Sequence, residues 1–339
     1  MVISPQEFLA QELNSPILDV RTPAEFEEAH IPGAINLPIF DNNERALVGT
    51  VYKNHSPDQA LKVGLDIVGP KMSSIVSTAQ RIAPDGKARV YCWRGGMRSN
   101  SMAWLLTTAG FQVDVLEGGY KAFRNEIRRA ISNDFDFRVL GGFTGSAKTQ
   151  VLHSMKEQGA QVIDLEGIAK HKGSSFGNLL EEEQPGTEAF IVKVWDELRK
   201  LDPNQVIWME DESRTIGRVY VSDELLYQIK NSRLIFIERT MEQRAAFLAE
   251  DYGNIDPHLL KLGFERITKR LGGQNVQLAI ELIDQGDLAG AATIGLRYYD
   301  KTYSHGLSKR EAENVQTFDG KGINPEETAK ALLASNIWK

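Results

Sequence analysis

The sequence predicts an α/β protein with two parallel-sheet domains and a helical subdomain that ends the second. In both halves short apolar runs alternate with segments of helical spacing, and each half carries a glycine-containing loop directly after an apolar run. After Thr240 the pattern turns almost wholly helical. A length of 339 residues, 42% hydrophobic and 25% charged, is enough for two soluble globular cores.

The first half follows a strand, helix, strand order, which is the βαβ pattern of a parallel sheet. Strands are expected at 17–21, 87–91 and 112–116, and helices at 71–83 and 99–108. The basic and polar segment from Arg128 to Phe137 is expected to be the linker between the domains.

The second half repeats this order and then becomes helical. Strands are expected at 137–140, 161–164, 206–209 and 234–237, and helices at 188–201, 223–230, 241–250, 257–271, 276–284 and 287–303. The predicted domains are 1–133, then 134–320 with its helical subdomain from about 240, then a helical tail at 321–339.

The composition indicates a cytoplasmic protein. The amino-terminal residues lack the basic and apolar regions of a signal peptide, and no apolar run approaches the roughly 20 residues that span a bilayer. Cys92 is the only cysteine, so it forms no internal disulfide and no CxxC metal site. A net charge of -7 argues against unselective coating of nucleic acid, although a local basic surface is compatible with it.

Cys92 opens the octapeptide 92–99 at the end of a predicted strand. There, the N–H groups of a tight turn and the positive end of a helix dipole lower the pKa of a thiol. Gly95 and Gly96 let the backbone curl around the sulfur, and Arg94 and Arg98 add positive charge. The alternative is that Cys92 is a buried small hydrophobe.

A second loop, at 142–149, matches a Walker A phosphate-binding loop except at one position. It predicts a P-loop NTPase-like α/β domain. Ala147 stands where the pattern has its second glycine, and a helical conformation that alanine tolerates is expected there. The predicted phosphate-binding residues are Gly142, Thr144, Gly145, Ser146, Ala147, Lys148 and Thr149.

Carboxylates end two of the predicted strands in the second half. Asp164 ends one strand, and Glu210 and Asp211 follow another, so all three are expected at the sheet edge where α/β proteins bind ligands. They are candidates for acid–base chemistry or for binding Mg²⁺, and no metal site is firm. Solvated turn carboxylates are the alternative.

The first loop and several segments before it resemble rhodanese domains. Cys92 to Arg98 is similar to the active loop, Asp19 to Arg21, Glu25-Phe26 and His30 to Asn36 resemble the amino-terminal signature, and Gly118 to Tyr120 resembles the closing turn. The resemblance implies a rhodanese-like parallel-sheet domain in which Cys92 carries sulfur or selenium. We expect Asp19 and Arg21 to form a structural ion pair.

Nearly the whole chain resembles the bacterial tRNA 2-selenouridine synthases. Similar segments, besides the loops, are 43–45, 48–53, 164–167, 171–177, 210–214, 216–217 and 298–300. The chain departs from that family at Ala147, where glycine is usual, and at Lys172, where arginine is expected.

The resemblance implies a two-step change of the wobble uridine of tRNA. A geranyl group from geranyl diphosphate first alkylates the 2-thiouridine sulfur, and selenium from selenophosphate then replaces the S-geranyl group. Lys148, Thr149 and the loop amides would hold the diphosphate, and Cys92 would carry selenium as a perselenide or assist its delivery. No tightly bound cofactor is implied.

An acidic protein that binds tRNA needs segregated basic residues. Lys261, Arg266, Lys269 and Arg270 lie on one predicted helix, and Arg124, Arg128 and Arg129 lie at the predicted linker. Further candidate RNA contacts are His171, Lys172, Arg214 and Arg218. Trp93, Phe176 and Tyr220 are candidates for stacking on a base. Solvated helix faces are the alternative for the basic sets.

Two other classes of function remain open. A P-loop kinase or ATPase with an appended rhodanese domain predicts ATP turnover and no RNA product. A non-catalytic rhodanese-type binding module predicts that Cys92→Ser leaves function intact.

Overall fold

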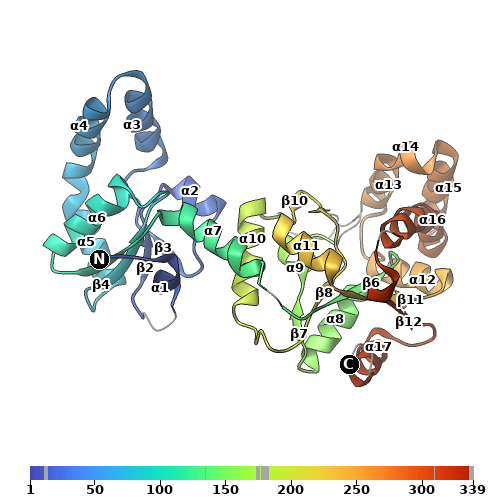
Figure 1. The fold of residues 1–339 in the computed structure, drawn as a ribbon. Coiled ribbons are helices and arrows are strands. Elements are labelled where there is room, and N and C mark those ends of the chain that lie inside the picture. Colours follow the sequence, from blue (N-terminus) through green and yellow to red (C-terminus); the bar gives the residue numbers. More distant parts are fainter. Residues whose placement is uncertain (11–13, 134, 173–175, 177–182, 309, 336–339) are drawn as a thin grey trace. The chain divides into compact units, whose positions relative to one another are not determined.

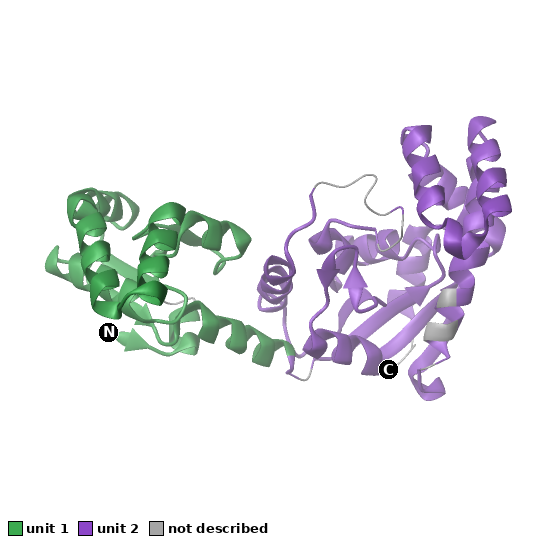
Figure 2. Ribbon diagram, turned by 90° about the horizontal axis from the view of Figure 1, so that it is seen from above, with its two compact units in different colours: residues 1–131 green, residues 132–339 purple. Residues whose placement is uncertain are grey.

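The computed structural model describes residues 1–10, 14–133, 135–172, 176, 183–308 and 310–335. The chain divides into two compact units, Met1–Ile131 and Ser132–Lys339, which Figure 2 colours separately. The predicted domain boundary lies after residue 133. Each unit contains its own five-stranded parallel sheet, so the α/β fold class is confirmed.

The sheet of the first unit has the strand order β1-β5-β4-β2-β3. Its three inner strands coincide with the three predicted apolar runs, because inner strands are buried on both faces. The edge strands β1 and β3 are too short to carry a pattern. The strands are β1 (Val2–Ile3), β2 (Ile17–Asp19), β3 (Ala34–Asn36), β4 (Lys87–Tyr91) and β5 (Gln112–Leu116).

Helices of the first unit pack on this sheet. Side chains of α4, α5 and α6 form one core with β2, β4 and β5, and α1 and α7 pack on each other and on β5. Figure 1 shows α3 and α4 side by side. The helices are α1 (Pro5–Leu9), α2 (Pro23–Glu28), α3 (Asn42–Asn54), α4 (Pro57–Val68), α5 (Met72–Ile82), α6 (Met97–Thr108) and α7 (Gly119–Ile131), with the 3-10 turn η1 (Gly69–Lys71).

The predicted linker from Arg128 is wrong over its first four residues. Helix α7 continues to Ile131 because Tyr120, Phe123, Ile127 and Ile131 are buried at helical spacing. Arg124, Arg128 and Arg129 therefore lie on a helix of the first unit. Asp134, part of the predicted linker, lies outside the described residues.

The sheet of the second unit has the strand order β12-β11-β6-β8-β7. Four strands match predicted runs, but β12 falls in a region expected to be helical. Its side chains are mostly exposed and polar, and only its pairing with β11 reveals it as a strand. The strands are β6 (Phe137–Gly142), β7 (Gln161–Ile163), β8 (Ile207–Glu210), β11 (Arg233–Glu238) and β12 (Val315–Asp319), beside a separate antiparallel pair, β9 (Thr215–Ile216) and β10 (Val219–Tyr220).

The helix predicted at 257–271 is two helices. The chain bends at Ile267, a buried residue with φ -99° and ψ 8°, so α13 ends and α14 begins there. The helices of the second unit are α8 (Lys148–Glu157), α9 (Leu165–Ala169), α10 (Thr187–Leu198), α11 (Asp223–Asn231), α12 (Met241–Asp251), α13 (Pro257–Arg266), α14 (Thr268–Leu271), α15 (Gly273–Asp284), α16 (Leu288–Leu307) and α17 (Pro325–Ala334), with the 3-10 turn η2 (Ala312–Asn314).

Helices α12 to α16 form the predicted helical subdomain, which Figure 1 shows in orange and red. It begins at Thr240, whose hydroxyl accepts from the Gln243 N–H while the Gln243 side chain accepts from the Thr240 N–H. Leu260, Phe264, Val276 and Ile283 belong to its core. In the described part of the chain no helix has the length and apolar character needed to cross a membrane.

Candidate functional site

Cys92 lies between the end of β4 and the start of α6, as predicted, and is 3% exposed. Its Sγ lies 3.2 Å from Ser99 Oγ. Burial alone raises the pKa of the thiol, but hydrogen bonds from the Ser99 hydroxyl and from the N–H groups of Arg94, Ser99 and Gly96 outweigh it. The pKa of Cys92 is therefore lowered, and the loop favours an anion at this position.

Two glycines allow the Cys92 loop to curl. Gly95 has φ +64°, and a Cβ there would lie 2.8 Å from the Leu116 carbonyl oxygen. A Cβ on Gly119 would lie 2.4 Å from the Cys92 carbonyl oxygen. The prediction is wrong for Gly96, whose φ is -102° and whose Cβ would meet no atom within 4 Å. The close approach depends on Gly95 and Gly119.

The two predicted arginines play different parts. Arg94 is exposed and gives its backbone N–H to the sulfur. Arg98 pairs with Glu25, with Nη1 2.7 Å from Oε2, so much of its charge is neutralised. Both arginines line an open pocket at Cys92, together with Arg45 of α3, which sequence reasoning did not select. An anion that enters this pocket meets the thiol at its wall.

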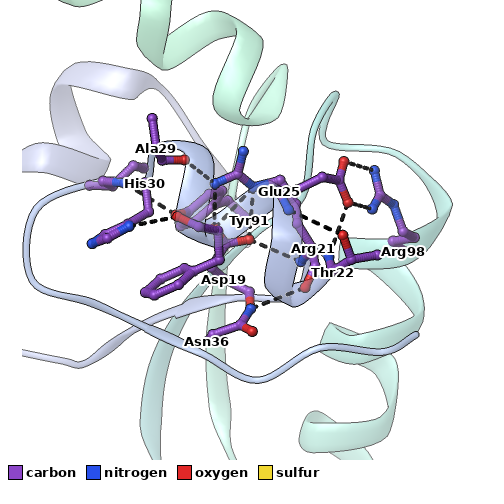
Figure 3. Close-up of polar contacts among 11 residues, drawn as sticks. Asp19, Arg21, Thr22, Glu25, Ala29, His30, Asn36, Tyr91 and Arg98 are labelled. Carbon is purple, nitrogen blue, oxygen red and sulfur yellow. Dashed lines mark hydrogen bonds and ion pairs between the residues drawn. The ribbon is translucent and has the colours of Figure 1, made fainter. Parts of the chain in front are cut away.

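The Asp19–Arg21 ion pair is confirmed, and Figure 3 shows its surroundings. Both side chains are almost fully buried, and Arg21 Nη2 lies 2.6 Å from Asp19 Oδ2. The Tyr91 hydroxyl donates to the same oxygen over 2.6 Å. The Arg21 guanidinium also lies 4.0 Å from the centre of the Tyr120 ring. With every charge paired, this cluster supports the loop and has no free group for chemistry.

We predict that Ser99→Ala raises the pKa of Cys92 by about one unit, because a hydrogen bond to a charged group contributes roughly 1.5 kcal/mol and one pKa unit corresponds to about 1.4 kcal/mol. The thiolate fraction at neutral pH should then fall several-fold. The pH dependence of thiolate ultraviolet absorbance measures this directly, since the chain has one cysteine. Ser101→Ala, at an exposed position of α6, is the matched control. An unchanged titration of Cys92 in S99A would show that Ser99 does not lower the pKa of the thiol.

An apolar groove begins at the Cys92 pocket. Arg45, Met97 and Arg98 line both spaces, and the groove continues between α3, α4, α5 and α6 over Leu61, Leu65 and other apolar side chains. Leu61 and Leu65 are 44% and 58% exposed, which is unusual for a cluster of leucines. The first unit thus places a thiol with a lowered pKa beside a hydrocarbon surface.

The phosphate loop lies between β6 and α8, as predicted. Gly142 and Gly145 have φ +152° and +82°, and a Cβ on either would collide with neighbouring atoms. Lys148 Nζ donates to the Gly142 carbonyl across the loop over 3.2 Å. Burial lowers the pKa of Lys148, but the acidic groups of Tyr303, Glu166 and Glu212 raise it overall, so the ammonium stays charged.

Ala147 does not have the predicted helical conformation. It is left-handed, with φ 60° and ψ 33°, and precedes the first turn of α8. A loop whose amides converge on one point needs a left-handed residue here, and this is why glycine is usual in the pattern. The loop therefore keeps the shape of the cradle and carries backbone strain of roughly 1 kcal/mol.

We predict that Ala147→Gly increases the free energy of unfolding of the second unit by about 0.5–1 kcal/mol, because it removes this strain. Denaturant unfolding followed by tryptophan fluorescence measures the change. Ala331→Gly, in the middle of α17, should lower the same quantity by about 1 kcal/mol. A lower free energy of unfolding in A147G would contradict the claim that the backbone of Ala147 is strained.

The three predicted carboxylates lie at the sheet edge but differ in state. Asp164 caps α9 and lies 2.6 Å from His153 Nε2. Glu210 is fully buried, and burial with repulsion from Asp164 raises its pKa well above the ordinary value. Burial raises the pKa of Asp211, but Lys230 and Arg310 lower it overall, at 2.8 and 2.7 Å. Asp211 is thus engaged in structural ion pairs.

Sequence reasoning missed a second acidic pair, Glu166 and Glu212, beside the phosphate loop. The Thr149 hydroxyl donates to Glu166 Oε2 over 3.0 Å, and the two carboxyl groups share a hydrogen bond. Burial and mutual repulsion raise the pKa of Glu212 well above its usual range, and burial also raises that of Glu166. Their positions two or three residues beyond β8 and β7 were the available signal.

Arg244, also missed, fastens the helical subdomain to the phosphate loop. The side chain is 4% exposed, and its Nη1 and Nη2 lie 2.8 and 2.7 Å from the Asp300 carboxylate. Nη1 also donates to the Thr144 carbonyl over 3.2 Å. One residue of α12 therefore joins α16 and the loop. Asp300 lies in a segment that resembled the synthase family, but its partner was not evident from the sequence.

Most of the predicted RNA contacts of the second unit pair with an acidic or tyrosine side chain. Lys172 holds Asp251 at 2.8 Å and Arg214 holds Asp223 at 2.5 Å, while Lys261 pairs with Asp284. Arg218 lies 3.6 Å from Glu183, and Arg270 donates to the Tyr298 hydroxyl. Arg266 and Lys269 are exposed, whereas His171 is buried, which lowers its pKa. Gly173, Ser174, Ser175 and Gly177, beside His171 and Lys172, lie outside the described residues.

The three aromatic candidates also differ. Tyr220 is 58% exposed, and Trp93 is half-buried against Tyr120. Phe176 packs between Tyr252 and Phe264 in the helical subdomain, with ring centres 6.4 and 5.1 Å away, so it serves packing. Within the described ranges, no group of three His, Cys, Asp or Glu side chains is arranged to hold a metal ion.

Comparison with known proteins agrees with the division into two units. Residues 4–126 match the rhodanese-like domain family, and residues 135–330 match the family described as the tRNA 2-selenouridine synthase AAA domain. The tRNA 2-selenouridine synthase of Proteus mirabilis is 32% identical over 350 residues, which cover 92% of this chain and 94% of that one. That of Marinobacter nauticus is 30% identical and covers 88% and 90%. That of Nitrosomonas europaea is 35% identical over 70% of this chain and 64% of its own length.

A rhodanese-like domain joined to a phosphate-loop domain, with synthases as relatives, defines the chain as a tRNA-modifying enzyme. The matches extend through both units and cover most of the chain. It belongs to the tRNA 2-selenouridine synthase family.

Proposed function

We propose that this enzyme converts the wobble 2-thiouridine of tRNA to 2-selenouridine in two steps in the cytoplasm. Geranyl diphosphate is the donor in the first step and selenophosphate in the second. The observation that carries the proposal is the joint presence of an activated thiol beside an apolar groove and a phosphate loop with a charged lysine. A kinase needs only the phosphate loop and its lysine.

In the first step the thiouridine sulfur attacks the carbon of geranyl diphosphate that bears the oxygen. The C–O bond breaks, diphosphate leaves, and the base loses its N3 proton to give a neutral S-geranyl nucleoside. Negative charge grows on the leaving diphosphate, where Lys148 and the loop amides would stabilise it. The Lys148 position across the loop, 3.2 Å from the Gly142 carbonyl, suits this role.

Magnesium fits the first site as a co-ligand of the diphosphate. The oxygens of Thr149, Glu166 and Glu212 are of the type that Mg²⁺ prefers, and Mg²⁺ in phosphate sites is commonly held by one or two carboxylates plus the phosphates. Glu166 and Glu212 share a hydrogen bond, and Glu166 accepts from the Thr149 hydroxyl, so these three oxygen-bearing groups lie together. Bound magnesium would neutralise part of the diphosphate charge.

In the second step selenide replaces geranyl thiolate at C2 of the base. Water cleaves the P–Se bond of selenophosphate and releases phosphate and hydrogen selenide. The selenide forms the new C–Se bond, the C–S bond breaks with loss of geranyl thiolate, and the proton of the selenide passes to N3 of the base. No oxidant or reductant is consumed. Cys92, whose thiolate form is stabilised by the loop that holds it in an open pocket, would assist delivery of selenium to C2. The adjoining apolar groove supports this assignment because it can accept the geranyl chain.

The test uses the purified full chain with tRNA that contains 2-thiouridine. The tRNA is digested after incubation with each donor alone and with both, and the nucleosides are weighed by mass spectrometry. Geranyl diphosphate alone should give S-geranyl-2-thiouridine, and both donors should give 2-selenouridine without ATP. An absolute requirement for ATP would favour the kinase alternative, and an unaltered base with every donor would refute the proposal.

A further inference from the structure

The helical subdomain of the second unit contains an apolar pocket. Leu260, Phe264, Ile283 and Leu296, from α13, α15 and α16, are among the side chains that line it. Leu260, Phe264 and Ile283 also belong to the core of this subdomain. Protein interiors are packed as closely as organic crystals, so an open pocket within such a core calls for an occupant.

This pocket adjoins the phosphate site. Thr144, Leu248, Tyr252 and Tyr299 line both the apolar pocket and the polar pocket that contains Lys148 and Thr149. Thr144 belongs to the phosphate loop itself. A ligand that extends past Thr144 therefore passes from a cationic cradle into a space walled mainly by hydrocarbon.

The two pockets are held together by charged contacts within the second unit. Buried Arg244 bonds Asp300 of α16 and the Thr144 carbonyl at the same time. A Cβ on Gly145 would lie 2.8 Å from the Arg244 carbonyl oxygen, which shows how closely the loop rests on α12. The relative position of cradle and apolar pocket is thereby fixed.

We propose that the apolar pocket holds the isoprenoid chain of a prenyl diphosphate whose diphosphate lies in the phosphate loop. The inference rests on the proposed function and locates its first substrate. A nucleotide fits less well, because a base and a ribose would leave polar groups without partners against leucine, isoleucine and phenylalanine. An amphiphile with a charged head and a hydrocarbon tail matches both ends of the site.

The test fills the pocket with a phenylalanine side chain and measures kcat/KM for prenyl donors of different chain length. Ala249 of α12 lines the pocket, whereas Ala246 on the same helix is exposed, so Ala249→Phe and Ala246→Phe form a matched pair. We expect A249F to lower kcat/KM for geranyl diphosphate by at least about 10-fold and to change that for dimethylallyl diphosphate by less than about 3-fold. A246F should leave both unchanged. Ala292→Phe, which fills the pocket from α16, should repeat the A249F result.

Calorimetric binding of inorganic diphosphate, which needs only the phosphate loop, serves as the folding check and should be equal in all variants. If wild type forms S-geranyl product but A249F and A292F keep its donor preference, the pocket assignment is wrong. If wild type forms no S-geranyl product, the proposed function fails. The affinities for geranyl diphosphate and inorganic diphosphate then test whether the pocket binds the isoprenoid chain. Geranyl diphosphate should bind wild type at least about 10-fold more tightly than inorganic diphosphate, with the difference lost in A249F. Equal affinities, or ATP binding as tight as geranyl diphosphate, would overturn the inference.

Discussion

Lys148→Ala is expected to lower the rate of S-geranyl formation by at least about 100-fold, the loss typical when one charge-stabilising group is removed from a transition state. Lys148 supplies the cation that spans the phosphate loop, and Tyr303, Glu166 and Glu212 keep it charged. Its loss leaves a developing diphosphate beside two carboxyl groups. Nucleoside mass spectrometry under single-turnover conditions measures the rate.

The matched control is Lys156→Ala, which removes a lysine from the exposed end of the same helix. It should leave the rate of S-geranyl formation unchanged. When preformed S-geranyl tRNA is supplied, K148A should still give 2-selenouridine, because the second reaction is assigned to the first unit. Geranylation by K148A at the wild-type rate would show that Lys148 of the phosphate loop does not act in the first step.

The fold was predictable where burial leaves a periodic trace. The inner strands β2, β4 and β5, and β6, β8 and β11 in the second unit, are rich in buried apolar residues because neighbouring strands and helices cover them. The edge strands β1 and β12 are different, since β1 has two residues and β12 is mostly exposed, whereas the edge strand β7 has two buried apolar residues and was predicted. The existence of β1 and β12 depends on a neighbouring strand that is distant in the sequence, and no local pattern encodes that partner.

The loops were predictable in position but not in conformation. The strand-to-helix location of Cys92 and of Lys148 follows from the local sequence. The left-handed backbone at Ala147 does not, because alanine prefers a right-handed helix and is held otherwise by its surroundings. The need for glycine at position 119 is also not evident locally. It arises from close contact with the Cys92 carbonyl oxygen, which lies 27 positions earlier in the chain.

The charged partners were least predictable. Arg98 was expected to act on the sulfur, but Glu25 holds it, and Arg310 and Lys230 similarly neutralise Asp211. Each pair joins residues far apart in sequence, so composition alone cannot show which charges remain free. Arg310 lies in a segment for which no element was predicted, and this explains why Asp211 was included among the candidate acids.

Cys92→Ser is expected to lower 2-selenouridine formation by at least about 100-fold, as removal of a chemically active side chain does in other enzymes. A serine hydroxyl is not ionised at neutral pH, so the hydrogen bonds from the Arg94, Gly96 and Ser99 amides would stabilise no anion. The first reaction uses the phosphate loop of the other unit. S-geranyl tRNA should therefore form at the wild-type rate and accumulate.

Comparison with Ser99→Ala separates chemistry from packing. S99A keeps the sulfur but raises the pKa of Cys92, so selenation should fall several-fold at neutral pH and recover as the pH rises past the new pKa. C92S should show no such recovery. If C92S instead formed 2-selenouridine at the wild-type rate, Cys92 would be a buried packing residue, and the first unit would serve only to bind tRNA or the donor.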